Sequence, residues 1–214
     1  AWIGSAAVEA TVLTTRNDLP YKTFDDLKKV KEPISLASMG PGASDHQFFV
    51  FLEKFAGLNT KFIIYPSSAE ASLAVERKEV DGQGGSYSSL KPFIDRGLVR
   101  PLVRGRVAVS GIETLPVDED FAVDKKGKTL MAMRSAPDSM GRPYVAPPGT
   151  PEATVNVLRD AFAKGAKDPA AQEDAKKNKM ALEYVPAREV QKVLKNLLNQ
   201  PPDIVNEFGK YVKF

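Results

Sequence analysis

The residues best placed to do chemistry lie together in one short segment, 38–46, with the sequence Ser-Met-Gly-Pro-Gly-Ala-Ser-Asp-His. An apolar β-branched run precedes it and an amphipathic stretch follows it. This order predicts a strand end, a glycine-rich turn and a helix N-terminus in succession. Glycines let the backbone approach a ligand, and the first helical turn offers N–H groups without intrahelical partners and a partial positive charge. The segment is therefore a candidate anion site.

The glycines of this segment also have a simpler interpretation. Gly40 and Gly42 would equally suit a plain tight turn between a strand and a helix, and the pattern alone leaves both interpretations open. A nucleotide phosphate loop is disfavoured, because the segment has neither a Gly-Lys-Ser/Thr ending nor a Gly-x-Gly-x-x-Gly pattern.

Ser44, Asp45 and His46 are the residue types of a hydrolytic relay. Adjacent residues at a helix start point about 100° apart, so these three cannot line up as a relay without distant partners. His46 is the only histidine that could serve as a base, and its simpler role is that of a helix cap or pocket wall. The chain is therefore predicted not to be an enzyme and no catalytic residue is assigned, with a small hydrolase kept as a disfavoured alternative.

Composition excludes several classes of protein and site. The 214 residues contain no cysteine and one histidine, which excludes disulfides, thiolate metal sites and histidine-rich metal sites, so no metal site is assigned. Lys and Arg number 30 against 27 Asp and Glu, with the two signs interleaved, which argues against a nucleic-acid partner. No apolar run approaches the roughly 20 residues needed to span a bilayer.

From residue 8 to about 104, apolar runs alternate with amphipathic stretches, the pattern of successive strand and helix units on a parallel sheet. The expected strands are 8–13, 34–38, 61–65 and 98–103, and the expected helices begin at Thr23, Ser44, Ser67 and Leu90. Asp26 is expected to complete a capping box with Thr23, and the helix from Ser44 is expected to end at Gly57 and to bury one apolar face, made by Phe48, Phe51, Leu52 and Phe55. Residues 105–128 lose this periodicity. Residues 144–214 contain short strands among several helices whose apolar faces need a sheet, so we expect these helices to expose apolar surface or to self-associate.

Several further motifs follow the glycine-rich segment in a fixed order. They are Tyr-Pro at 65–66, Ser-Ala-Glu-Ala at 68–71, Val-Asp-Gly at 80–82, Ser-Ser-Leu at 88–90 and Tyr-Val-Ala-Pro-Pro-Gly-Thr-Pro at 144–151. The succession, which covers most of the chain, resembles the substrate-binding receptors of tripartite tricarboxylate transporters, the TctC or Bug family.

The resemblance implies an α/β fold of the periplasmic-binding-protein type, the type II Venus flytrap, in which two lobes close over a small carboxylate. It implies a periplasmic location, membrane transporter subunits as partners and no cofactor, and it leaves di- and tricarboxylates, aromatic acids and amino acids open as ligands. The expected divisions are 1–5 as a hinge strand, 6–104 as a parallel-sheet second lobe, and 105–214 as a crossover and the helix-rich C-terminal part of the first lobe. The effector-sensing domain of a transcriptional regulator shares this architecture and stays as an alternative.

The resemblance also implies a set of ligand-binding residues. In the glycine-rich loop they are Ser38, Gly40, Gly42, Ala43, Ser44 and His46, and after the Val-Asp pair they are Asp81, Gly85, Ser86 and Tyr87. Ser86 and Tyr87 stand in for an aspartate that many relatives carry, and Asp81 could equally have a structural role in a turn. The family's first-lobe loop, a Pro-x-Gly-Gly-like segment, is not found, so we expect a fragment that begins just before the second lobe and binds ligand weakly by itself.

Overall fold

The computed structural model describes residues 1–178 and 180–212, and the chain divides into two compact units. Unit 1 consists of Ala1–Glu9 and Ala136–Gln200, and unit 2 consists of Ala10–Ser135 and Pro201–Phe214. Each unit has its own sheet. The glycine-rich segment lies in unit 2.

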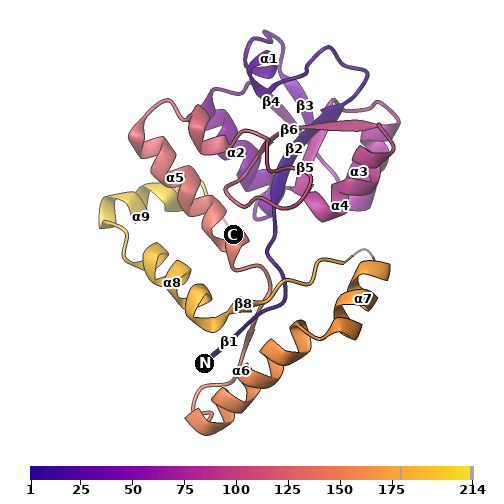
Figure 1. Cartoon of the computed structure of the whole chain (residues 1–214). Coiled ribbons are helices and arrows are strands. Elements are labelled where there is room, and N and C mark those ends of the chain that lie inside the picture. The colour runs from indigo at the N-terminus through magenta and orange to yellow at the C-terminus, as the bar shows by residue number, and fades with distance from the viewer. Residues whose placement is uncertain (179, 213–214) are drawn as a thin grey trace. The chain divides into compact units, whose positions relative to one another are not determined.

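Unit 2 is built on a five-stranded sheet in the order β4-β3-β5-β2-β6 (Figure 1). β3 (Ile34–Ser38) pairs in parallel with β4 (Thr60–Ile64) and β5 (Gly82–Ser86), whereas β2 (Thr11–Arg16) pairs antiparallel with β5 and with β6 (Val99–Arg104). β3, β4, β5 and β6 therefore run in the same direction, as expected for a parallel sheet. β2 runs in the opposite direction, so the expectation is wrong for this strand. β2 is buried almost throughout. A continuous run of buried residues indicates that a strand lies inside a sheet, but it does not indicate the direction in which the strand runs.

Helices cover both faces of this sheet (Figure 1). Gln83 of β5 faces α3, where its side-chain nitrogen donates to Ser72 Oγ at 3.1 Å. The next residue, Gly84, faces α2, and a Cβ there would lie 2.6 Å from the ring of Phe49. The helical segments of unit 2 are α1 (Phe24–Lys28), α2 (Ser44–Ala56), α3 (Ser68–Glu76), α4 (Tyr87–Asp95), the 3-10 turn η1 (Asp118–Phe121), α5 (Lys125–Ser135) and α9 (Pro202–Gly209).

The predicted helix boundaries follow local hydrogen bonding. Thr23 and Asp26 form the expected capping box at the start of α1, and Ser67 accepts from the Glu70 N–H at the start of α3. α2 ends at Gly57 in the left-handed conformation, with φ of 73°. Its predicted apolar stripe is confirmed, because Phe48, Phe51 and Leu52 are completely buried.

The C-terminal helix α9 packs in unit 2. Its neighbour Tyr211 lies 5.1 Å from Phe55 between ring centroids, and Phe208 lies 5.5 Å from Phe51. Glu207 accepts from Lys126 of α5 at 3.0 Å. The expected division at residue 104 therefore needs correction, because 105–135 and 201–212 pack with the sheet of unit 2. Sequence periodicity reveals an apolar helix face but not which surface will cover it.

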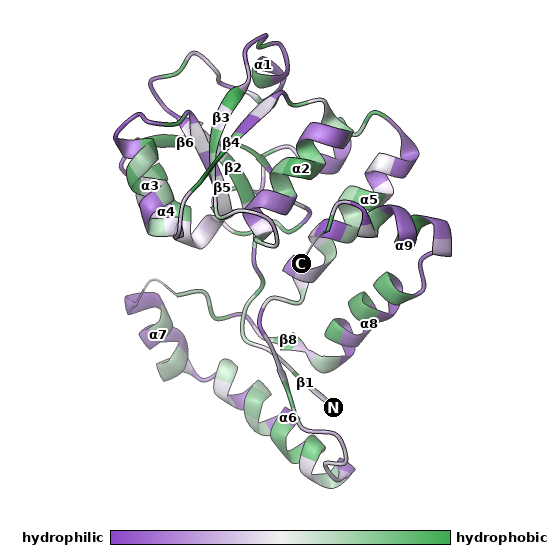
Figure 2. Ribbon diagram, turned by 180° about the vertical axis from the view of Figure 1, so that it is seen from behind, coloured by the Kyte–Doolittle hydropathy of each residue, from purple (hydrophilic) through white to green (hydrophobic). Residues whose placement is uncertain are grey.

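Unit 1 has a three-stranded antiparallel sheet in the order β7-β1-β8. Its elements are β1 (Trp2–Ser5), the 3-10 turn η2 (Ala136–Ser139), β7 (Pro143–Val145), α6 (Glu152–Ala166), α7 (Pro169–Lys177), β8 (Val185–Pro186) and α8 (Ala187–Leu198). Ile3, Ala146 and Val155 form its small core, with Phe162 packed against them. α7 is hydrophilic and buries no residue (Figure 2). Val157 and Leu198 are 66% and 73% exposed, so unit 1 does present apolar side chains to solvent.

Unit 2 also encloses a buried ion pair. Arg134 Nη2 lies 3.4 Å from Asp118 Oδ2, and both side chains are almost completely buried. The Arg134 guanidinium also lies over the ring of Phe48, 4.5 Å from its centroid. Burial raises the pKa of Asp118 to about 6, although the charge of Arg134 opposes this shift.

This shift gives a pH prediction. The native state holds a proton on Asp118 more readily than the unfolded chain, so its contribution to the unfolding free energy is greatest near pH 4 and is lost as the pH rises to about 6. Asp118→Asn should remove this part of the pH dependence in urea unfolding between pH 4 and 7.5. Asp95→Asn, in an exposed ion pair with Lys91, should keep the wild-type profile. An unchanged profile in Asp118→Asn would contradict the assignment.

A second prediction concerns α9. Phe208→Ala should lower the unfolding free energy of unit 2 by about 2 kcal/mol, because a half-buried ring is lost from the aromatic cluster on α2. Val205→Ala on the same helix should change it by less than about 0.5 kcal/mol, because Val205 is exposed. Chemical denaturation followed by tyrosine fluorescence measures both, and equal effects would show that α9 does not depend on this contact.

Candidate functional site

The candidate site lies at the carboxyl ends of the parallel strands of unit 2. Ala37 of β3 pairs with Gln83 of β5, and Ser38 pairs with Ile64 of β4. The turns that follow these strands therefore lie at one edge of the sheet, which is where open α/β sheets bind ligands. The glycine-rich loop follows β3, the central strand of the three.

The conformation of this loop requires glycine. Gly40 and Gly42 have φ angles of 89° and 91°, a region that residues with a Cβ rarely adopt. Pro41, Gly42 and Ser44 are exposed. The predicted succession of a strand end, a glycine-rich turn and a helix N-terminus is confirmed.

Part of the loop backbone is satisfied internally. The N–H of Met39 donates to Asp45 Oδ2 at 2.9 Å, and the N–H of Gly40 donates to Ser38 Oγ at 3.1 Å. The N–H of Ala43 donates to the carbonyl of Gly40 at 3.1 Å. These bonds fix the loop in one shape.

The remaining N–H groups of the loop are available. Within the described part of the chain, no acceptor meets the N–H groups of Gly42, Ser44, Asp45 or His46. Ala43, the N-cap of α2, provides no side-chain cap. Because unpaired N–H groups at a helix start favour negative charge, the loop can hold an anion.

Ser38 and His46 support the loop from inside. The Ser38 hydroxyl is completely buried, already accepts from Gly40, and lies 3.0 Å from His46 Nδ1. The imidazole also packs edge-on against Phe62, with centroids 5.0 Å apart. Ser38 therefore positions His46, and its hydroxyl is not exposed to a ligand. If Ser38 donates to Nδ1, the proton of the neutral imidazole is on Nε2, which can then donate.

The side chains of Ser44, Asp45 and His46 do not form a relay. The Asp45 carboxylate accepts from Met39, and the His46 imidazole bonds Ser38. Neither bonds the Ser44 hydroxyl. The three adjacent side chains diverge, as expected for consecutive residues at the start of a helix.

Asp81 is not brought to this loop. It precedes β5 and bonds Ser35, with Ser35 Oγ donating to Asp81 Oδ2 at 2.7 Å and the Asp81 N–H donating to Ser35 Oγ at 3.0 Å. The Ser35 N–H also donates to Asp81 Oδ2, at 2.9 Å. Ser35 lies near the amino end of β3, whereas Ser38 ends that strand. The structure thus favours the structural role for Asp81, which fastens β3 to β5.

The run after Asp81 divides into two parts. Gly85 and Ser86 end β5 and are partly exposed at the site edge. Tyr87 is 7% exposed and packs with Leu90 and Ile112 in the core, so the structure does not support it as a ligand contact.

Ser88 and Ser89 are site-edge residues that the sequence reasoning did not assign. Both are exposed in the first turn of α4, and the Ser86 hydroxyl donates to Ser89 Oγ at 2.8 Å. The Ser-Ser-Leu motif at 88–90 could have indicated them, because it places two hydroxyls directly after a strand.

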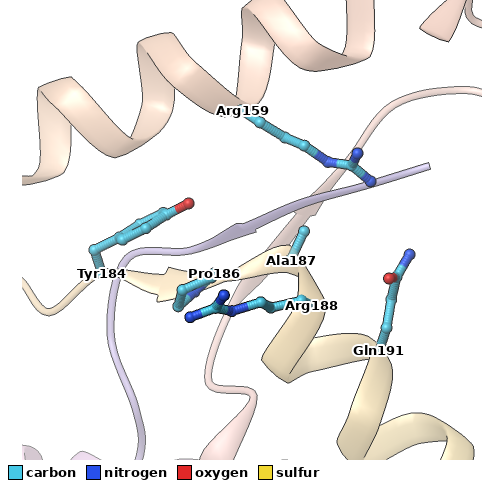
Figure 3. Close-up of a pocket in the computed structure, with 6 residues that line it drawn as sticks. All are labelled: Arg159, Tyr184, Pro186, Ala187, Arg188 and Gln191. Atoms are coloured by element: carbon cyan, nitrogen blue, oxygen red, sulfur yellow. The ribbon is translucent and has the colours of Figure 1, made fainter.

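Unit 1 has a separate pocket of about 240 Å³, shown in Figure 3. Its lining residues are Arg159, Tyr184, Pro186, Ala187, Arg188 and Gln191. Arg159 Nε donates to the carbonyl of Trp2 at 2.9 Å, and Arg188 Nε lies 3.4 Å from Glu189. None of the residues predicted to bind ligand lines this pocket, and both arginines already have protein partners.

The described residues include no cluster of three or more His, Cys, Asp or Glu side chains that could hold a metal ion. No helix in the described ranges is both long and apolar enough to cross a membrane.

The chain has an α/β fold with a mixed sheet and a glycine-rich loop at its carboxyl edge, and its family match and similar solved structures assign this fold to the periplasmic-binding-protein class. The chain belongs to the family described as tripartite tricarboxylate transporter family receptor, TctC, which matches residues 2–210. It is similar to a UPF0065 protein of Bordetella pertussis, with 25% identity over 204 residues that cover 93% of this chain. The chain spans about 60% of the length of that relative.

Solved structures show the same fold. A TctC solute-binding protein from Polaromonas matches with a TM-score of 0.73 and 20% identity over 96% of this chain and 68% of its own. The periplasmic binding protein BugD matches with a TM-score of 0.65 and 22% identity over 99% of this chain and 69% of its own. R. palustris Rpa4515, solved with adipate, matches with a TM-score of 0.65 and 16% identity over 97% of this chain and 67% of its own.

The Ser35 and Asp81 contacts predict a structural phenotype. Asp81→Ala should lower the unfolding free energy by about 1–3 kcal/mol, because the Ser35 N–H and hydroxyl lose their acceptor. Asp95→Ala, which removes an exposed carboxylate, should have little effect. Thermal unfolding measures both variants. If the Asp81→Ala protein were as stable as the wild type but had lost ligand binding, Asp81 would instead be a ligand-binding residue.

Proposed function

We propose that this chain is the ligand-binding part of an extracytoplasmic solute-binding receptor, which captures a small carboxylate and delivers it to a tripartite tricarboxylate-type membrane transporter. The observation that carries the proposal is the row of available N–H groups at Gly42, Ser44, Asp45 and His46. Family membership supports the role of a receptor, and on this proposal the protein acts in the periplasm and catalyses no reaction.

The loop suits a carboxylate for a physical reason. A carboxylate has two acceptor oxygens, and N–H donors at a helix start meet it with hydrogen bonds that are each worth about 1.5–3 kcal/mol. Gly42 has no side chain to obstruct the approach, and its neighbours Pro41 and Ser44 are exposed. Such a site recognises the carboxyl group and leaves the rest of the ligand to other contacts.

The proposed contacts follow from this geometry. Gly42, Ala43, Ser44 and His46 border the available donors, and Gly40 supplies the turn that exposes them. Gly85 and Ser86, with the hydroxyls of Ser88 and Ser89, border the same sheet edge. The adipate in R. palustris Rpa4515 supports a small carboxylate as the ligand class.

The effector-sensing domain of a transcriptional regulator remains the alternative with the same architecture. Membership of a transporter receptor family favours the receptor.

Gly42 provides the test of this proposal. Gly42→Val should weaken carboxylate binding by at least about tenfold, because the new side chain obstructs the backbone donors. Gly57→Val is the matched control, since Gly57 also has a positive φ, of 73°, but lies at the other end of α2. Both substitutions place a side chain at a positive φ, so a difference in affinity between the two variants depends on the position of Gly42 in the loop.

Calorimetry of the full-length gene product measures these affinities against adipate, malate, citrate, benzoate and glutamate. The proposal expects at least one of these carboxylates to bind, and expects Gly42→Val to reduce that binding while Gly57→Val retains it. Equal affinities in both variants, or no binding of any member, would contradict the proposed function.

A further inference from the structure

The pocket of unit 1 is separate from the glycine-rich loop and has no role in the proposed function. Its volume is about 240 Å³, which is below the roughly 300–1,000 Å³ of pockets for drug-sized ligands. Figure 3 shows that the lining side chains come from α6, from the segment before β8 and from the start of α8. A cavity of this size suits a small ligand.

The lining of this pocket carries positive charge that no lining residue neutralises. Two of its six residues are arginines, and none is acidic. Arg188 forms an ion pair with Glu189, but Nε and Oε1 are 3.4 Å apart and the two side chains are 83% and 48% exposed, so the pair is weak. The partners of Arg159 among the described residues are neutral, namely the Trp2 carbonyl and, at 3.4 Å, the Asn156 side chain. The pocket therefore has an excess of positive charge.

Both guanidinium groups keep N–H donors for a ligand, because an arginine has five of them. The bond to the Trp2 carbonyl uses Nε of Arg159, at 2.9 Å, and Nη2 of Arg159 meets no acceptor among the described residues. Neither terminal nitrogen of Arg188 makes a hydrogen bond in the described part of the chain. Arg159 is thus held in place by the backbone, whereas the exposed side chain of Arg188 can turn toward a ligand.

The other lining residues also suit an anion. Lys167 Nζ lies 5.3 Å from the centre of the Tyr184 ring, which brings a third cation close to the lining. The Tyr184 hydroxyl and the Gln191 amide can each donate a hydrogen bond. Pro186 and Ala187 complete the wall without adding charge. A singly charged anion would leave one of the two guanidinium groups unpaired, so two negative charges match this lining better.

We propose that the pocket of unit 1 is a second binding site, which holds a small anion with two negative charges between Arg159 and Arg188. Guanidinium groups bind carboxylate and phosphate oxygens through paired N–H donors, so an inorganic oxyanion and a short dicarboxylate both carry this chemistry. The site is independent of the glycine-rich loop and goes beyond the proposed function.

Calorimetry of the 214-residue chain tests this site with anions of known charge. The doubly charged probes are sulfate, phosphate, succinate and adipate, and the singly charged probes are chloride and acetate. At least one doubly charged probe should bind about tenfold or more tightly than either singly charged probe. Binding of sulfate and phosphate alone would identify an oxyanion site, and binding of succinate or adipate alone would identify a dicarboxylate site.

Two variants assign the binding to this pocket. Arg188→Gln should weaken it by about tenfold, because the charge-assisted bonds of one guanidinium group are lost. Arg77→Gln is the matched control, since Arg77 is an exposed arginine 4.0 Å from Glu79 and lies in unit 2, and it should retain the wild-type affinity. Glu189→Gln should tighten the binding several-fold, because Arg188 loses a competing carboxylate. A misfolded variant would not show this gain.

Three results would overturn the second site. The first is that no doubly charged probe binds, or that Arg188→Gln and Arg77→Gln bind it equally well. The second is that Gly42→Val abolishes the binding and Arg188→Gln does not, because the anion then occupies the glycine-rich loop and the proposed function stands without this site. The third is that the 214-residue chain binds the probe and the full-length gene product does not, because another part of the protein then fills the pocket.

Discussion

The site depends on one constraint, which is that the N–H groups at the start of a helix have no partners within the helix. At the start of α2 these N–H groups are bonded only in part. The N–H of the N-cap Ala43 donates to the Gly40 carbonyl, whereas the N–H groups of Ser44, Asp45 and His46 meet no acceptor among the described residues. A helix end that satisfied every donor internally would have nothing to offer a ligand. The partial satisfaction gives the loop both a fixed shape and a binding capacity.

The rest of unit 2 holds this loop in place. Hydrogen bonds between Ser35 and Asp81 fasten β3 to β5, so the strand that leads into the loop is fixed at its other end. α2 is fixed by its buried aromatic face, and Phe51 contacts Phe208 from α9 at 5.5 Å. Residues that do not touch the loop therefore determine its rigidity. A rigid loop binds more tightly because less conformational freedom is lost when the ligand arrives.

Two buried aspartates in unit 2 show how context decides the role of a charge. Asp118 is paired with Arg134, and its backbone contact with the Glu119 N–H at 2.9 Å satisfies the other oxygen. Burial still dominates and raises the pKa of Asp118 to about 6. Asp45 has one backbone donor and no cation among the described residues. The first aspartate has a cation and a backbone donor, whereas among the described residues the second has a backbone donor alone.

The sequence by itself determined the glycine-rich loop, the capping box at Thr23, the end of α2 at Gly57 and the buried stripe of that helix, because these features depend on residues within one or two turns of each other. The order of its motifs also identified the family. Only the tertiary structure decided the direction of β2, the packing of α9, the burial of Ser38 and Tyr87, and the pairing of Asp81 with Ser35. Each of these depends on segments distant in the chain, and a local pattern shows that a residue is apolar or polar but not which distant partner it will meet.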